Sequence, residues 1–264
     1  MLALVRVMLT GLLFTCSLTA QHPLYEATDA RNGALGGAAL ADDGFTALWS
    51  NAAGLATHRG LSYGAWVQQA SGHHRLKTVS LGAGYGGLGV RGSVLRIGTY
   101  AASRISTAYG RRLTKRWRLG GELSLFRQRV TGYAGQSTLG ACLATQYTLT
   151  DALQMGLHWR FPGRADQSPM LAACGGRYRI NQRLMLYVAE QFDVRRGWNT
   201  LVALAYRPVD VVGLRLGYSS IHSRLSFGAS YRIGSRLAVD VVAVTHPLLG
   251  LGGGAGFARE SDNF

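Results

Sequence analysis

The sequence predicts an all-β protein: a transmembrane antiparallel up-and-down β-barrel of about 14 strands that encloses a short N-terminal hatch segment. Three observations lead to this prediction. From residue 60 onward, apolar residues alternate with polar or glycine residues in one short segment after another. The chain begins with a pattern typical of exported proteins. Turns that contain tyrosine recur after even-numbered segments, which gives one end of the barrel a common composition.

The composition excludes two other classes of glycine-rich chain. The 264 residues include 36 glycines but only 5 prolines. Collagen needs a strict triplet period and abundant proline, and disordered chains lack this many aromatic and β-branched residues. Glycine without proline suits tightly curved strands, where a missing side chain lets the backbone bend or another chain approach.

Residues 1–20 are predicted to be a signal peptide. One positive residue, Arg6, precedes an apolar run over residues 7–18, and the segment ends in Leu-Thr-Ala before Gln21. The run is too short and too near the start for a comfortable membrane span, so we expect export and an outer-membrane location. Cys16 leaves a lipoprotein signal as an alternative, although Thr15 before it fits such a signal poorly.

Residues 21–58 are predicted to form a hatch or plug ahead of a barrel domain of residues 59–264. Residues 30–55 read ARNGALGGAALADDGFTALWSNAAGL, a compact Gly/Ala-rich stretch that nothing later in the chain resembles. A unique first element followed by many similar hairpins suggests a plug and a barrel. The residues expected to form the hatch motif are Asp42, Asp43, Trp49, Asn51, Gly54 and Leu55.

Each hatch residue has an expected role. Asn51 and Gly54 supply the polar side chain and the backbone freedom that a reversing turn needs. Trp49 and Leu55 act as apolar anchors. Asp42 and Asp43 pair with arginines that point into the barrel, which fixes the hatch electrostatically. Alternatively, Asp43 caps a short helix that starts near residue 44.

The strands follow from the period-two alternation. Residues 138–149 show it well, with leucine, alanine and tyrosine on one face and glycine, cysteine and glutamine on the other. Most predicted strands are near the length that a tilted strand needs to cross a bilayer. A soluble β-sandwich also alternates and is the alternative. The expected strands cover residues 60–69, 74–83, 87–97, 102–113, 117–130, 135–149, 152–162, 168–180, 183–193, 198–207, 211–219, 222–232, 236–246 and 249–258.

A ring of tyrosines is expected at one end of this barrel. Tyrosine settles at membrane–water boundaries, and the arginines beside these tyrosines can meet lipid phosphates, so outer-membrane lipid is an expected partner. An exported N-terminus starts in the periplasm, which places the ring on the periplasmic side and the short opposite connections outside. The ring consists of Tyr109, Tyr147, Tyr178, Tyr206 and Tyr231.

The net charge of +15 comes almost entirely from arginine. Such a balance is typical of proteins that bind nucleic acid or anionic membranes. Because the arginines divide between turns and the polar faces of strands, they form no single basic stripe, and we expect no nucleic-acid partner. The inward arginines either pair with inward acids or line an anion path. The charges expected in the lumen are Arg91, Arg104, Arg118, Glu122, Arg215, Arg224, Arg232 and Asp240.

No catalytic, cofactor or metal site is expected, so the sequence does not predict an enzyme. Cys142 and Cys174 lie two strands apart on opposite faces, which predicts two packed thiols rather than a disulfide. The adjacent pair His73 and His74 points opposite ways on an extended chain. Residues 82–87 match the G-x-G-x-x-G pattern without a following helix, which makes the match a chance one. No serine or cysteine is placed with a base by the sequence.

The first element carries a resemblance to a known family. The pattern of that family is Ala-Arg-x-x-x-Leu-Gly-Gly-Ala, then Ala-Asp-Asp, then Trp-x-Asn-Pro-Ala-Gly-Leu. Residues 245–250 of this chain are similar to a His-Pro-x-Leu-Gly segment that the family carries near its end. On these residues the chain resembles the PorV/PorQ family of outer-membrane barrels from Bacteroidetes-type bacteria, which is related to the FadL fatty-acid channel. Ala52 stands where the family has proline. The matching residues are 30–31, 35–38, 41–43 and 49–55.

The resemblance implies a fourteen-stranded barrel with an internal hatch and offers two functions. The PorV/PorQ type is non-enzymatic and accessory to type IX protein secretion or to surface attachment, with secretion-system proteins as partners. The alternative is a FadL-like passive channel, with hydrophobic small molecules as ligands.

Overall fold

A computed structural model describes residues 29–69, 77–162, 170–194, 196–248 and 250–261 of the chain. The predicted signal peptide, Cys16, the first residues of the predicted hatch and the pair His73 and His74 lie outside these described residues. None of the helices in the described ranges is long and apolar enough to cross a membrane.

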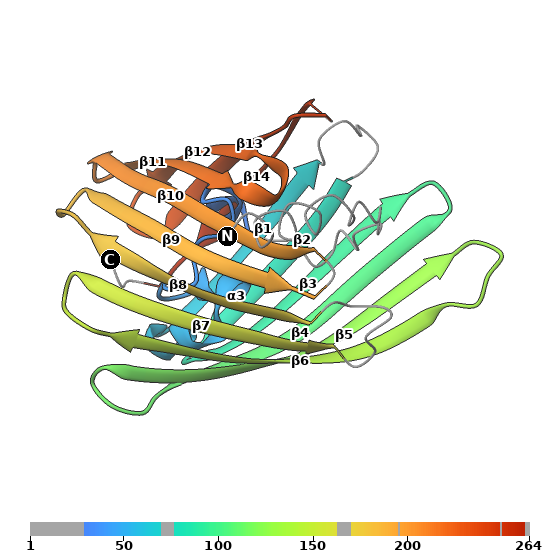
Figure 1. Ribbon diagram of the computed structural model, residues 1–264, viewed down its shortest axis with the longest axis horizontal. Coiled ribbons are helices and arrows are strands. Elements are labelled where there is room, and N and C mark those ends of the chain that lie inside the picture. Colours follow the sequence, from blue (N-terminus) through green and yellow to red (C-terminus); the bar gives the residue numbers. More distant parts are fainter. Residues whose placement is uncertain (1–28, 70–76, 163–169, 195, 249, 262–264) are drawn as a thin grey trace, which may run out of the picture.

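The chain forms a closed antiparallel barrel, which confirms the predicted fold class (Figure 1). Each strand pairs with its neighbours in sequence, and β1 pairs with β14 to close the wall. The strands are β1 (Leu61–Gln69), β2 (Lys77–Tyr85), β3 (Leu88–Ile97), β4 (Tyr100–Arg112), β5 (Trp117–Val130), β6 (Gln136–Thr148), β7 (Leu153–Pro162), β8 (Leu171–Arg179), β9 (Leu184–Asp193), β10 (Gly197–Val209), β11 (Val212–Ser219), β12 (Arg224–Ile233), β13 (Leu237–His246) and β14 (Gly250–Arg259).

The expected strand order is therefore correct, and the boundaries differ by a few residues. The largest differences are at β2 and β8, which begin at Lys77 and Leu171 rather than at residues 74 and 168. The wall is uneven in height, because β4, β5 and β6 are 13, 14 and 13 residues long whereas β1 and β2 have 9 each. Figure 1 shows the hairpin of β5 and β6 reaching beyond its neighbours.

The two faces of the wall differ in polarity. Large apolar side chains on the outside are strongly exposed, as at Leu81 (58%), Leu123 (66%) and Leu139 (69%). The inward positions carry glycine, serine and other polar residues, many of them buried. A soluble sandwich buries its apolar face in its core, whereas here the apolar face is outside. The structure therefore decides against the sandwich alternative.

Residues 29–58 lie inside the barrel, where Figure 1 shows them in blue. This inner segment contains the short helix α2 (Ala30–Ala34), the single turn α3 (Ala47–Ser50) and the 3-10 helix η2 (Ala52–Thr57). The helix η2 contacts β4, β5 and β6, and α2 contacts β11 to β14. From inside the barrel, the segment thus contacts two separate parts of the wall, β4–β6 and β11–β14.

Glycines in the wall allow this close approach. A Cβ atom on Gly120 of β5 would collide with the backbone of Ala53, and one on Gly156 of β7 would collide with the carbonyl oxygen of Leu40. A Cβ atom on Gly217 of β11 would likewise collide with the backbone of Leu35. The abundance of glycine noted in the sequence therefore has a specific cause here: backbone packs on backbone between wall and inner segment.

Candidate functional site

The inner segment is bound to the wall by an acidic clamp, which we define as Asp42 and Asp43 with their partners on five adjacent strands. Asp43 forms ion pairs with Arg118 of β5 and with Arg177 of β8, the latter at 2.8 Å. It also accepts a hydrogen bond from the Gln154 amide of β7 at 2.9 Å. Burial alone would raise the pKa of Asp43, but the guanidinium groups of Arg177 and Arg118 outweigh burial and lower that pKa.

Asp42 extends the clamp to β9 and β6. Its carboxylate accepts a hydrogen bond from the hydroxyl of Tyr187 at 2.9 Å and lies 3.4 Å from Arg177. The Gln146 amide donates to the carbonyl oxygens of Asp42 and Leu40, at 2.9 and 3.1 Å. The sequence singled out Asp42, Asp43 and Arg118 but missed these four wall partners, which are Gln146, Gln154, Arg177 and Tyr187. All four have polar side chains at inward positions of successive strands, and this pattern could have identified them as candidate partners of the inner segment.

Asp43 is not the N-cap of the helical turn that follows it, so the alternative in which Asp43 caps a helix is wrong. The turn α3 starts at Ala47 and has Thr46 as its N-cap. The hydroxyl of Thr46 donates to the carbonyl oxygen of Asp43, and the carboxylate of Asp43 is directed to the wall instead. Each of the two strand arginines offers that carboxylate a full opposite charge, whereas a helix N-terminus offers only neutral backbone N–H donors.

Asn51 begins a tight turn that ends at Gly54, and its side chain is also the centre of a wider set of hydrogen bonds. Its oxygen accepts from the amide of Ala53 and so caps η2, at 3.0 Å. Its amide donates to the carbonyl oxygens of Leu40, Leu157 and Thr145, at 2.9, 3.2 and 3.3 Å. Asn51 thereby joins two parts of the inner segment to β6 and β7, and it is 1% exposed.

Gly54 differs from its expected role. It lies within η2, and it is not among the described residues with positive φ. A Cβ atom at Gly54 would collide with the carbonyl oxygen of Asp42 and with Ala47. The position therefore requires glycine for close packing within the inner segment, not for backbone freedom.

The apolar anchors lie together on the side of β1 to β3. The ring of Trp49 meets the ring of Trp66 edge-on at 4.9 Å between centroids, and Phe45 stacks on Trp66 at 6.2 Å. Leu55 is fully buried in the same cluster. Gly82 and Gly89 give Leu48 and Trp49 room against β2 and β3. This side of the inner segment is held by burial of apolar surface.

A second charged cluster, the Glu122 cluster, lies entirely within the wall. Both oxygens of Glu122 of β5 accept from Arg91 of β3, at 2.8 and 2.9 Å, and one also accepts from Arg104 of β4, at 2.5 Å. Ser106 and Ser124 each accept a hydrogen bond from Arg104, and Ser124 donates one to Glu122. Arg91 additionally lies over the ring of Trp49 at 5.3 Å. The expected pairing of lumen charges is thus present, and these arginines do not line an open path.

The remaining predicted lumen charges lie on the opposite side of the barrel. Arg215 of β11 pairs with Asp240 of β13 at 2.9 Å, and Arg224 and Arg232 share the inward face of β12. Asp29, which caps α2, is buried beside Arg215 and Asp240. Burial raises the pKa of Asp29 to about 7, so this carboxyl group titrates near neutral pH.

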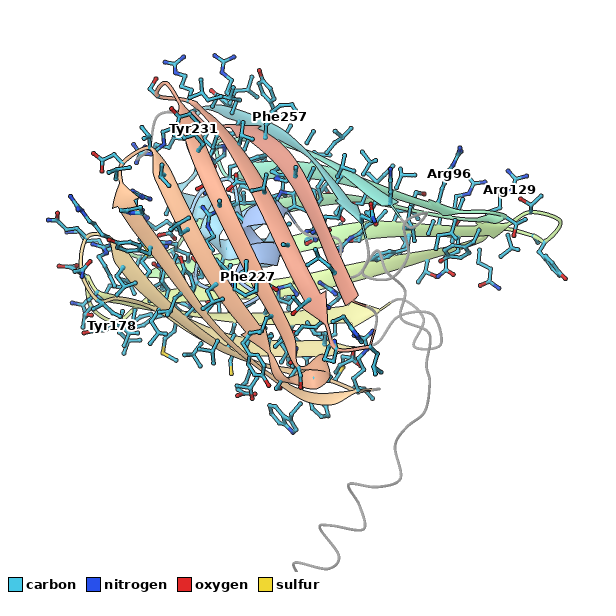
Figure 2. All side chains as sticks on the ribbon, turned by 90° about the horizontal axis from the view of Figure 1, so that it is seen from above. Arg96, Arg129, Tyr178, Phe227, Tyr231 and Phe257 are labelled. Carbon is cyan, nitrogen blue, oxygen red and sulfur yellow. The ribbon has the colours of Figure 1, made fainter. Side chains whose placement is uncertain are left out.

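The five predicted rim tyrosines are all exposed, from 45% at Tyr147 to 55% at Tyr231. They lie toward the end of the barrel where the inner segment passes into β1, which we call the tyrosine end. In Figure 2, Tyr178 and Tyr231 lie toward one end, and Phe227 lies nearer the middle.

Cys142 and His158 form a pair that the sequence did not reveal, which corrects the expectation that no cysteine meets a base. The Sγ atom of Cys142 on β6 is 3.3 Å from Nε2 of His158 on β7, and Nδ1 of His158 is 2.9 Å from the carbonyl oxygen of Ser50. They are diagonal neighbours across the two strands. The cavity that includes Cys142 has a volume of only about 10 Å³. Cys174 is exposed on β8, and both thiols are free.

A larger cavity of about 360 Å³ lies at the tyrosine end between the inner segment and the wall of β9 to β12. Asp42, Asp43 and Arg177 of the acidic clamp form part of its lining, together with Phe45 and Met185. No group of three or more metal-binding side chains occurs among the residues that the structure describes.

No protein-family model and no curated protein sequence matches this chain. Its fold is similar to that of solved channel structures. The CymD monoaromatic hydrocarbon channel matches at a TM-score of 0.71 and 10% identity, over 90% of this chain and 98% of that one. The Ralstonia pickettii toluene transporter TbuX matches at 0.67 and 10%, over 84% and 95%. The Pseudomonas putida toluene transporter TodX matches at 0.63 and 11%, over 83% and 95%.

At these identities the likeness concerns the fold alone. It supports the outer-membrane type of barrel that the sequence predicts. None of these structures singles out the PorV/PorQ family.

Proposed function

We propose that this protein is a non-enzymatic outer-membrane barrel that passes small hydrophobic molecules, as in the FadL-like alternative drawn from the sequence. The observation that carries the proposal is a closed fourteen-strand barrel, apolar outside, with a folded segment packed inside one end. Three solved barrels of this shape are named as hydrocarbon channels or toluene transporters. Residues 21–58 would act as the hatch, and residues 1–20 as the export signal.

The acidic clamp is the part of this hatch that can open. It joins the inner segment to β5–β9 through polar contacts, and these exchange for water at lower cost than buried apolar contacts do. The cavity of about 360 Å³ lies directly beside it and is large enough for a small ligand. A molecule released from the lumen would leave through this cavity once Asp42 and Asp43 separate from Arg177.

A lateral exit through the wall has less support. The strand pairing is continuous between neighbours over the described residues, except at β10, where the register with β11 shifts between Tyr206 and Val209. Pro208 lies in this shift, and proline cannot donate a ladder hydrogen bond. This position, next to the same cavity, is where the described wall is least regular.

The test is uptake of a monoaromatic hydrocarbon by Gram-negative cells that carry the barrel in their outer membrane. Wild-type protein should raise initial uptake of radiolabelled toluene above that of cells without it. Replacing both clamp acids, Asp42→Asn and Asp43→Asn, should change the uptake rate, whereas Asp151→Asn in an exposed turn should not. Equal uptake with and without the barrel would contradict the channel. Purified protein that shows no heat-dependent gel shift and stays soluble without detergent would contradict the barrel in a membrane.

A role as an accessory of type IX secretion or surface attachment is the second candidate. It rests on the motif over residues 30–55, which resembles the PorV/PorQ pattern. The described connections opposite the tyrosine end are short, as between β3 and β4, which leaves little surface for a protein partner. Stable co-purification with secretion components from the native host would favour this candidate over the channel.

A further inference from the structure

The outer face of the wall carries four cations near the end opposite the tyrosines. They are Lys77 of β2, Arg96 of β3, and Arg127 and Arg129 of β5, and all four are exposed. We call them the outer basic patch. Figure 2 shows Arg96 and Arg129 projecting outward near the same end, far from Tyr178 and Tyr231.

The strand register brings these cations into one row. Lys77 lies directly opposite Arg96, Arg96 lies opposite Ala101 of β4, and Ala101 lies opposite Arg129. Neighbouring strands are about 4.8 Å apart, so Arg96 and Arg129 are separated by only one narrow strand. Arg127 occupies the next outward position below Arg129.

Nothing in this part of the chain neutralises the row. Glu122 is the one acidic residue between residues 59 and 150, and it points into the lumen. None of the four cations forms a salt bridge with a residue in the described ranges. Like charges directly opposite each other across two strands, as at Lys77 and Arg96, destabilise a sheet. The row is therefore suited to an anion from outside the chain.

An apolar surface adjoins the row on the side toward the barrel middle. Val79, Val94 and Leu125 lie one or two outward positions below the cations, and they are exposed by 45%, 49% and 45%. A molecule that fits both parts has anionic groups at one end and hydrocarbon chains at the other. The cations and the apolar side chains lie on the same outward face of β2–β5.

We propose that the outer basic patch binds the phosphate groups of a phosphorylated lipid of the outer leaflet, whose acyl chains lie along the apolar face of β2–β5. This inference rests on the proposed outer-membrane location with the tyrosine end in the periplasm. It concerns the outside of the wall, so it is independent of what passes through the lumen.

The experiment measures binding of bisphosphorylated lipid A to the full-length protein in detergent, by native mass spectrometry and by competition with a fluorescent lipid. The variant that removes the patch is K77Q/R96Q/R127Q/R129Q. The matched control, R111Q/R112Q/K115Q/R116Q, removes four exposed cations from the tyrosine end of the β4–β5 hairpin. A heat-dependent gel shift establishes that each variant forms the barrel, which separates failure of this inference from failure of the proposed barrel.

The patch variant should bind the lipid about tenfold or more weakly, because each cation near an anionic lipid surface contributes favourably. The control should bind the lipid several-fold more tightly than the patch variant does, and wild-type binding should weaken with added salt. Dephosphorylated lipid should not distinguish wild type from the patch variant. Equal loss in the two variants would mean unspecific charge attraction and overturn the site. Displacement of the lipid by low concentrations of inorganic phosphate would identify a free-anion site and overturn the lipid assignment.

Discussion

The two charged clusters of the lumen, the Glu122 cluster and the acidic clamp, use the same residue types for different purposes. Glu122 and its partners Arg91 and Arg104 all belong to the wall, on three adjacent strands, and are 6% exposed or less. The clamp instead joins two separate parts of the molecule, because Asp42 and Asp43 come from the inner segment and their partners from the wall. The first cluster can only hold strands together. The second can release one part from the other.

Removing the charge of Glu122 should have the largest effect. Glu122→Gln leaves the buried guanidinium groups of Arg91 and Arg104 without their counterion, and breaking a buried ion pair costs about 3–5 kcal/mol. We expect the loss in the free energy of unfolding of the whole barrel, measured in urea in detergent or lipid. If Glu122→Gln left barrel stability unchanged and freed only the inner segment, the distinction between the two clusters would be wrong.

Filling the glycine contact should separate the inner segment from the wall without any change in charge. Gly120→Val places a side chain against the backbone of Ala52 and Ala53, and overpacking of this kind costs about 1–3 kcal/mol. Limited proteolysis should then cut within residues 29–58 faster than in wild type. Gly121→Val, the next residue on the outward face, is the control and should leave proteolysis unchanged.

Neutralising the clamp should weaken docking of the inner segment while the barrel stays intact. In Asp43→Asn, Arg118 loses its charged partner and Arg177 keeps only Asp42, and because Asp43 is about one-third exposed we expect a cost of about 1–2 kcal/mol. Hydrogen exchange of the amides in residues 40–50 should accelerate, and the acceleration should shrink at high salt. Unchanged exchange in these residues, with faster exchange in the strands, would contradict the clamp.

The pH dependence should distinguish the two ends of the inner segment. The pKa of Asp29 is raised to about 7, so its protonated form favours the folded state; this contribution is complete below about pH 4 and is lost as the pH rises through about 7. The pKa of Asp43 is lowered, so its contribution is lost in acid instead. Asp29→Asn keeps the N-cap and should remove the weakening of α2 between pH 5 and pH 8, which amounts to about 2–3 kcal/mol. Hydrogen exchange of residues 30–36 at both pH values provides the measurement, and an unaltered pH dependence in this variant would contradict the assignment.

Much of the architecture is already present in the amino-acid sequence. Period-two alternation is a local property. The sequence of one strand alone therefore shows which of its residues face inward and which face outward. For that reason the strand order, the inward position of Arg91 or Asp240 and the exposed tyrosine rim follow from the residues alone. The uniqueness of residues 30–55 likewise marked them as a separate element.

Only the tertiary structure decided which of these residues meet. Four consecutive strands bring Gln146, Gln154, Arg177 and Tyr187 to Asp42 and Asp43, which lie far from them in the sequence. The height of each side chain in the barrel depends on register, which alternation does not determine. The pair of Cys142 and His158 and the row of Lys77, Arg96 and Arg129 arise from register in the same way. The role of Gly54 was also hidden, because a residue's own neighbours in the chain do not show which backbone will lie against it.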